Sequence, residues 1–133
     1  MKRRWLSVLG AGMLLAGAVY VAVFGVVSLA GPFRGTAAVC FTLSAIFEIV
    51  AGQGERVGSV EWYQFMGAAN VLMGVMIGIH LVGGVVHGSP TPIGLDGMMA
   101  VGALSITWIG IDLLRGGRHF DPASYDSGPI LGR

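Results

Sequence analysis

Four long apolar segments dominate the sequence and limit what the chain can fold into. They cover residues 5–30, 35–52, 62–86 and 97–114. A helix needs about 17–25 apolar residues to cross the hydrocarbon core of a bilayer, which is roughly 30 Å thick. Each segment reaches this length and is too long and too apolar to be a strand. We therefore predict an all-α membrane protein with four transmembrane helices.

The composition argues against the other common classes of protein. Only 11% of the residues are charged, whereas 54% are hydrophobic. An average soluble domain has roughly twice that charged fraction. So few charges cannot cover the surface of a small water-soluble domain, and a net charge of +1 offers no basic face for nucleic acid. The lipid bilayer is the expected partner, and nucleic acid is not.

Basic residues predict the orientation of the helices, because the cytoplasmic ends of membrane helices carry an excess of Lys and Arg. One side of the predicted membrane holds only Arg34. The other side holds Lys2, Arg3, Arg4, Arg56, Arg115 and Arg118. We therefore expect a multi-pass protein of the cell membrane with both termini in the cytoplasm. The helices would form one domain over residues 1–118, followed by a flexible cytoplasmic tail over residues 119–133.

The first segment is open to a second interpretation. Residues 2–4 (KRR) resemble the basic start of a secretory signal peptide, and residues 16–18 (AGA) resemble its cleavage site. The apolar run nevertheless continues to Ala30 without a polar break, which is long for a signal peptide. We expect this segment to remain as a helix. Seven arginines to one lysine are typical of a GC-rich prokaryotic genome.

The chain can also be aligned with itself as two helical hairpins. Residues 10–17 (GAGMLLAG) align with residues 67–74 (GAANVLMG), and both second helices end near an acid, Glu48 or Asp112. Such parallel repeats are related by an axis along the membrane normal. The alternative is a chance alignment, because Gly, Ala, Val and Leu dominate all four segments.

Small residues recur at helical spacing in two of the segments. Gly12 and Ala16 lie four residues apart in the first, and Gly74 and Gly78 do so in the third. Residues four apart share a helix face, so each pair forms a smooth strip. Close contact at such strips holds membrane helices together. We predict that these strips pack within the chain; the alternative is contact with a second chain.

Ionisable residues inside apolar segments are costly and therefore mark candidate functional positions. Glu48 and Asp112 lie near the predicted cytoplasmic ends of the second and fourth segments, and Asn70 lies in the same half of the third. We hypothesise that these three residues form a cation or proton site. The alternative is interfacial anchoring, with Glu48 reaching headgroups and Asp112 paired with Arg115 three residues later.

The segment around Glu48 resembles a known family. Residues 45–52 (AIFEIVAG) look like part of the first helix of small multidrug-resistance exporters, which exchange protons for cationic drugs at a membrane glutamate. Those proteins also have four helices and a similar length. The resemblance implies that Glu48 is the coupling acid. It covers eight residues, and in this chain it lies in the second helix.

A further group of polar side chains lies in the third segment. Met66, Met73, His80 and His87 are seven residues apart and lie close to one helix face, with Met76 between them. Residues seven apart are about 10 Å apart along a helix, too far to share one ion. We favour His80 as a hydrogen-bonded packing residue, or as part of the lining of a wet cavity, with no cofactor bound. A metal or haem site using His80, Met73 and Met76 is the alternative.

The sequence lacks the motifs of the common enzyme classes, such as a phosphate-binding loop or a His-Glu-x-x-His zinc site. The segments outside the helices are also too short for a catalytic domain. We therefore expect a non-enzymatic membrane protein that acts as an accessory subunit or a homo-oligomer. The second hypothesis is a small ion- or proton-coupled transporter or channel that uses Glu48 and Asp112. A redox or metal protein built around His80 is the third.

Overall fold

A computed structural model of the chain describes residues 3–54, 56–88 and 93–124. Four long helices make up most of this part, and all four are long and apolar enough to span a membrane. They are α1 (Arg4–Phe24), α2 (Pro32–Gln53), α3 (Trp62–Val86) and α4 (Ile93–Leu114). The shorter elements are the 3-10 helices η1 (Val26–Leu29) and η2 (Pro122–Ser124) and the strands β1 (Arg56–Val57) and β2 (Val60–Glu61).

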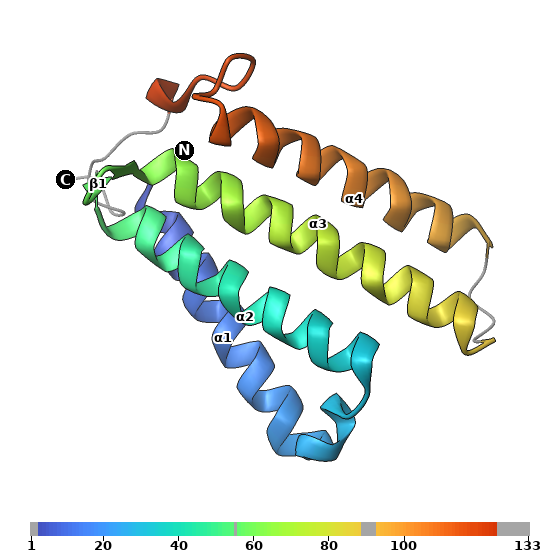
Figure 1. The fold of residues 1–133 in the computed structure, drawn as a ribbon. Coiled ribbons are helices and arrows are strands. Elements are labelled where there is room, and N and C mark those ends of the chain that lie inside the picture. The colour runs from blue at the N-terminus through green and yellow to red at the C-terminus, as the bar shows by residue number, and fades with distance from the viewer. Residues whose placement is uncertain (1–2, 55, 89–92, 125–133) are drawn as a thin grey trace.

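The helices form an open bundle in chain order. Helix α2 packs against α1 on one side and α3 on the other, and α4 packs against α3. Successive helices run in opposite directions, so η1, the end of α3 and the start of α4 lie at one end of the molecule (Figure 1). The start of α1, the β1–β2 hairpin and the end of α4 lie at the opposite end. We call this the basic end, because it holds Arg3, Arg4, Arg56, Arg115 and Arg118, and the other the far end.

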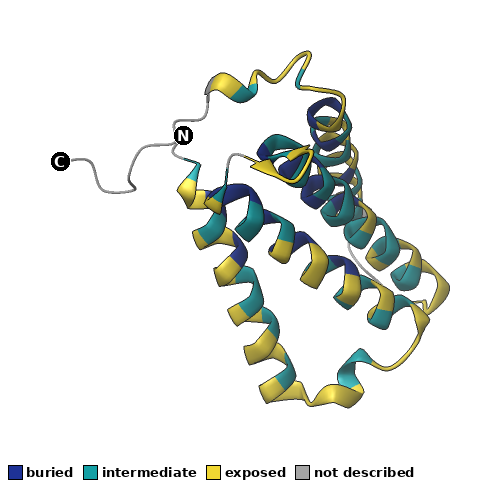
Figure 2. Cartoon of the chain, turned by 60° about the vertical axis from the view of Figure 1, so that its left-hand side comes forward, coloured by how far each residue is buried: buried dark blue, intermediate teal, exposed yellow. Residues whose placement is uncertain are grey.

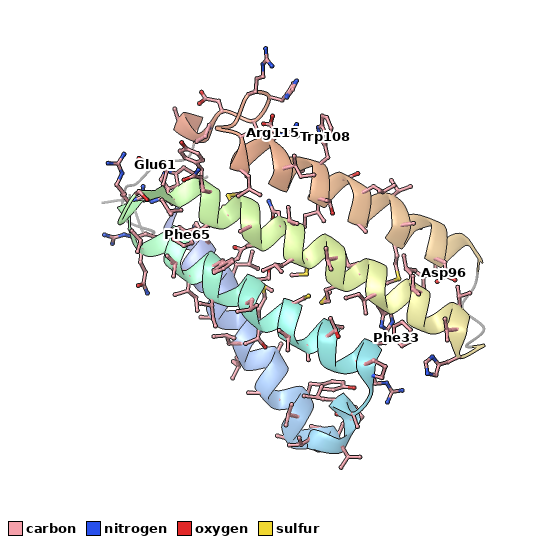
Figure 3. All side chains as sticks on the ribbon, viewed as in Figure 1. Phe33, Glu61, Phe65, Asp96, Trp108 and Arg115 are labelled. Carbon is pink, nitrogen blue, oxygen red and sulfur yellow. The ribbon has the colours of Figure 1, made fainter. Side chains whose placement is uncertain are left out.

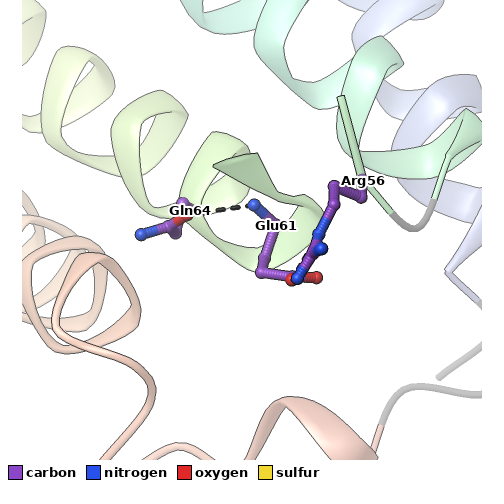
Figure 4. A network of polar contacts seen from close by, with 3 residues as sticks. All are labelled: Arg56, Glu61 and Gln64. Atoms are coloured by element: carbon purple, nitrogen blue, oxygen red, sulfur yellow. Dashed lines mark hydrogen bonds and ion pairs between the residues drawn. The ribbon is translucent and has the colours of Figure 1, made fainter. Parts of the chain in front are cut away.

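Helix α3 begins at Trp62, as the hydropathy pattern predicted, because the preceding residues cap it. The Glu61 side chain accepts the backbone N–H of Gln64, and Gln64 Oε1 accepts the Glu61 N–H at 3.0 Å. This reciprocal pair satisfies two N–H groups that the first helical turn leaves free. Arg56, across the hairpin, pairs with the same Glu61 carboxylate (Figure 4). The hairpin is thereby fixed to the start of α3.

Helices α1 and α4 differ from the predicted spans at one end each. Helix α1 ends at Phe24, not at residue 30, because Gly25 adopts a positive φ of 75° and the chain continues as η1. Helix α4 begins at Ile93, four residues earlier than expected, and so contains Asp96 in its first turn. Helix α2 also begins before its predicted start at residue 35: it begins at Pro32, a residue whose fixed φ suits the first helical position.

The tightest packing lies at the basic end. Leu6, Ala51, Trp62, Met66 and Leu113 form a buried cluster to which all four helices contribute. Buried residues gather at this end, whereas the lower part of α1 and the η1 segment are largely exposed (Figure 2). The helices therefore converge at the basic end and leave more of their surface uncovered at the far end.

Candidate functional site

Glu48 lies on the part of α2 where both neighbouring helices approach. Gly10 of α1 packs against it so closely that a Cβ on Gly10 would lie 3.0 Å from the Glu48 Cβ. One turn earlier, Ser44 donates a hydrogen bond to the Ala69 carbonyl of α3 at 2.9 Å. Only 6% of Glu48 is exposed. The side chain is therefore buried on α2, against α1 and one turn from a contact with α3.

One carboxyl oxygen of Glu48 has no hydrogen-bond partner. Oε2 is buried, and no described residue donates to it. An ionised carboxylate is expensive in apolar surroundings unless it is paired. The arrangement therefore favours a bound proton or a cation at this oxygen. This makes Glu48 the best candidate for a functional ionisable residue in the described helices.

Asp112 is also 6% exposed, but its carboxylate is fully engaged. Its Oδ2 accepts the backbone N–H groups of His119 at 2.9 Å and Phe120 at 3.0 Å, and its Oδ1 lies 2.8 Å from His119 Nδ1. Gly116 and Gly117, both with positive φ, allow the chain to turn back after α4. Asp112 thus holds the loop after α4, and the ion pair that we considered with Arg115 does not form.

This loop changes the interpretation of the tail. Residues 119–124 were expected to belong to a flexible segment, but His119 and Phe120 bond to Asp112, and Pro122–Ser124 form η2. The rest of the predicted tail, residues 125–133, lies outside the described residues.

Asn70 is 9% exposed and lies on α3 between two glycines that contact α4, Gly67 and Gly74. No hydrogen bond within the described part of the chain joins Asn70 to Glu48 or to Asp112. The structure thus buries all three candidate site residues but does not link them to one another. Glu48 remains alone as the candidate proton or cation group.

The candidate metal ligands are not gathered. The described residues contain no group of three or more His, Cys, Asp or Glu side chains that could hold a metal ion. His80 is exposed and lines a hollow at the far end, and neither Met73 nor Met76 is among the described residues that line it. A metal or haem site on these three residues stays a hypothesis without geometric support.

Helices α3 and α4 pack through small residues. Gly67 and Gly110 lie backbone to backbone, so that a Cβ on either one would lie within 2.7 Å of the other's carbonyl oxygen. Gly74, which the spacing predicted as a packing residue, lies against Thr107. A Cβ added to Gly74 would lie 2.9 Å from the Ala103 carbonyl oxygen. Gly78 has open space around it instead.

Helices α1 and α2 also pack through small residues, but not those that we predicted. A Cβ on Gly10 would collide with the Ala45 carbonyl, and one on Gly52 would collide with Ser7. Ser7 Oγ also donates to the Ile49 carbonyl at 2.9 Å. Sequence reasoning did not single out Gly10 and Gly67 as contacts, although both stand at the head of the aligned repeats.

The predicted strip on α1 faces away from the other described helices. No atom of a described residue lies within 4 Å of a Cβ added to Gly12, and Ala16 is exposed. The expectation of an intrachain contact at these two residues is therefore wrong for the described part of the chain. The reason is that α1 carries small residues on several faces, and only the face with Gly10 meets α2.

Comparison with known proteins gives a family but no activity. The profile of a family of unknown function (DUF7994) matches residues 1–126. No curated protein and no solved structure matches the chain. The comparisons therefore transfer no substrate, partner or catalytic role to any residue. The resemblance of residues 45–52 to small multidrug-resistance exporters stays a prediction.

Proposed function

Since the chain belongs to this family of unknown function, we propose from its own structure that it is a non-enzymatic, multi-pass protein of the cell membrane. It would act by assembling through α1, either as a homo-oligomer or as a subunit of a larger membrane complex. The observation that carries the proposal is the uncovered strip of Gly12 and Ala16 on α1.

The distribution of charge and aromatic residues supports a membrane location with the basic end in the cytoplasm. All described arginines except Arg34 lie at the basic end. Trp5 and Trp62 lie at the same end, and the Arg3 guanidinium stands 5.6 Å from the centre of the Trp62 ring. Basic residues and amphipathic aromatic rings concentrate in this way where a helix meets the cytoplasmic headgroups.

The packing inside the chain supports assembly through α1. Within each hairpin, the two helices meet at a glycine that lies against backbone atoms of the other helix, as at Gly10 and Gly67. Helices in lipid associate through such close contact because apolar burial provides no driving force there. Gly12 and Ala16 offer the same kind of surface, but α1 packs mainly against α2, on another face. A helix of a second polypeptide is the occupant that this surface fits.

The two hairpins also show related contacts, which supports the proposed internal repeat. Gly10 packs against the Ala45 carbonyl and the Glu48 Cβ, and Gly67 packs against the Gly110 carbonyl and the Leu113 Cβ. In each hairpin, a glycine of the first helix thus meets the turn of the second helix around the acid. We propose that α1–α2 and α3–α4 descend from one duplicated unit.

Affinity purification in mild detergent tests the assembly. We expect the tagged chain to recover a second, untagged copy or one stoichiometric partner, and we expect Gly12→Leu to abolish that recovery. The matched control is Gly102→Leu, because Gly102 of α4 has equally open space around it. Recovery of the wild-type chain only as a monomer would count against the proposal.

A second candidate function rests on a separate observation, the buried and unpartnered Oε2 of Glu48. In this candidate the protein is a small transporter or channel in which Glu48 binds a proton or a monovalent cation. Asp112 was the second acid of our hypothesis, but its hydrogen bonds to His119 and Phe120 favour a structural role. Glu48 alone would then carry the exchange.

Flux into liposomes tests this candidate. Purified protein should move protons or a cationic dye, and Glu48→Gln should abolish that flux while the helical content stays unchanged. Asp121→Asn is the matched control, because it neutralises an exposed acid outside the four helices. A wild-type protein that moves neither protons nor dye would refute the transporter and leave the assembly proposal standing.

A further inference from the structure

A hollow of about 500 Å³ opens at the far end, between the start of α2, the end of α3 and the start of α4. Its polar and aromatic lining includes Phe33, Arg34, His80, His87 and Asp96. Figure 3 shows Phe33 and Asp96 at this end, on α2 and α4. The hollow lies at the opposite end of the bundle from the buried cluster around Leu6.

Two opposite charges line this hollow without meeting. Arg34 comes from α2 and Asp96 from α4. Neither side chain forms an ion pair or a hydrogen bond within the described residues. Arg34 is exposed and Asp96 is half-buried, so both side chains can reach a ligand and form charge-assisted hydrogen bonds with it. The hollow therefore presents one unpaired cation and one unpaired anion to whatever enters it.

The wall between these charges is well packed. The Phe33 ring lies against Gly83, 3.3 Å from an added Cβ, and meets the His87 ring edge-on with centroids 5.6 Å apart. His87 Nδ1 lies 2.8 Å from the Gly83 carbonyl oxygen. Met99 and Ile79 add apolar surface to the same hollow. A ligand would find two charged side chains and a packed, largely apolar wall in one place.

We infer that this hollow binds a phospholipid whose headgroup carries both a phosphate and a primary ammonium group. The Arg34 guanidinium donates hydrogen bonds to the phosphate, and the ammonium donates to the Asp96 carboxylate. The inference rests on the proposed membrane location, which places the start of α2 and of α4 at headgroup level. The acyl chains then lie along the exposed apolar surface of the helices.

The chemistry distinguishes this headgroup from its common relatives. A choline headgroup has no N–H donor for Asp96, and a glycerol headgroup brings no positive charge to it. Phosphatidylethanolamine alone among these three satisfies both side chains. A water-soluble zwitterion with the same two groups offers the same contacts but lacks the acyl chains.

Native mass spectrometry of the delipidated protein in detergent tests the inference. The probes are phosphatidylethanolamine, phosphatidylcholine and phosphatidylglycerol with identical acyl chains, and free phosphoethanolamine. We expect phosphatidylethanolamine to bind about tenfold more tightly than the other lipids, the effect of one hydrogen bond to a charged group. Excess phosphoethanolamine should not displace it.

The variants assign the contacts. Arg34→Gln should weaken phosphatidylethanolamine and phosphatidylglycerol alike, whereas Asp96→Asn should weaken only phosphatidylethanolamine. Arg118→Gln, an exposed arginine at the basic end, is the control and should change neither. Equal binding of the three lipids by the wild-type chain would overturn the inference. So would a preference for phosphatidylethanolamine that neither Arg34→Gln nor Asp96→Asn changes. Displacement of the lipid by free phosphoethanolamine would show that the hollow binds a water-soluble zwitterion, and would overturn the inference of a lipid ligand.

The assembly proposal and the lipid inference fail separately. Loss of oligomers in Gly12→Leu does not involve Arg34 or Asp96, and headgroup selectivity can be measured on a monomer. Headgroup selectivity in a chain that never assembles would refute assembly alone. An assembled chain without selectivity would refute only the lipid site.

Discussion

Gly67 and Gly110 cross without side chains between them: a Cβ on Gly67 would lie 2.7 Å from the Gly110 carbonyl oxygen, and one on Gly110 would lie 2.6 Å from that of Gly67. This contact holds α3 against α4 by van der Waals packing of the two backbones. The Gly10–Ala45 contact does the same for α1 and α2. The stability of both hairpins should therefore depend on the absence of a methyl group at these positions.

Gly67→Ala is expected to lower the free energy of unfolding by about 1–3 kcal/mol, the usual cost of overpacking a close contact. Gly12→Ala should not lower it, because Gly12 has open space and alanine is the better helix former. The free energies of unfolding of both variants are measured by titrating the protein in mild detergent with SDS and following its circular dichroism. Equal effects of the two substitutions would contradict the assigned contacts.

Asp112→Asn is expected to destabilise the chain, because an amide is a weaker acceptor than a carboxylate for the N–H groups of His119 and Phe120. The loop should also open, so that trypsin cleaves faster after Arg118. Asp96→Asn is the control, since no described residue donates to Asp96. A cleavage rate that Asp112→Asn leaves unchanged would show that the carboxylate does not hold the loop.

Glu48→Leu should have the opposite effect on stability. It removes a buried carboxyl oxygen that has no partner, so we expect the free energy of unfolding to rise by about 1–3 kcal/mol, the cost of a buried unsatisfied polar group. The same SDS titration measures it. A clear loss of stability in Glu48→Leu would mean that the carboxyl group makes a structural contact in the folded protein.

Cysteine labelling tests the membrane topology. Cys40 is the only cysteine of the chain, so a Cys40→Ser background accepts single new thiols. Val27→Cys in η1, at a residue 83% exposed, should react with a membrane-impermeant maleimide in intact cells. Val57→Cys in the β1–β2 hairpin should react only after the cells are permeabilised. The reverse pattern would invert the orientation, and recovery of the chain in the soluble fraction would refute the membrane location.

The sequence predicted the four helices well, because hydropathy averaged over about 20 residues changes little with any single residue. It predicted the bounds of α3, where the polar residues Glu61 and Gln64 flank and cap the apolar run. It missed the end of α1, because Gly25 breaks the helix by its backbone conformation while the neighbouring Val26 and Val27 remain apolar. Hydropathy cannot detect a break of that kind.

The partners of the acids could not be predicted in the same way. Helical periodicity connects residues three or four apart, which suggested Arg115 for Asp112. The actual partner, His119, lies seven residues along the chain and beyond the turn at Gly116 and Gly117. Only the folded loop brings the two side chains together.

The contact glycines were hidden for a related reason. Helix α1 has small residues on several faces, among them Gly10, Gly12, Ala16 and Gly17. Spacing shows which of these share a face but not which face another helix covers. The structure resolves this, because Gly10 meets α2 and Gly12 meets no described residue.

The most direct test of assembly through α1 is photo-crosslinking in native membranes with a benzophenone-bearing amino acid at Ala16. Because this side chain reacts with any nearby polypeptide, it detects a second copy and a different subunit equally well. The same probe at Val101, an exposed residue of α4, is the control. We predict one discrete crosslinked band for the Ala16 probe. Its mass should be twice that of the chain, or that of the chain plus one partner polypeptide. If the Ala16 probe yields no protein adduct while the chain is folded in the membrane, the proposed assembly through α1 is wrong.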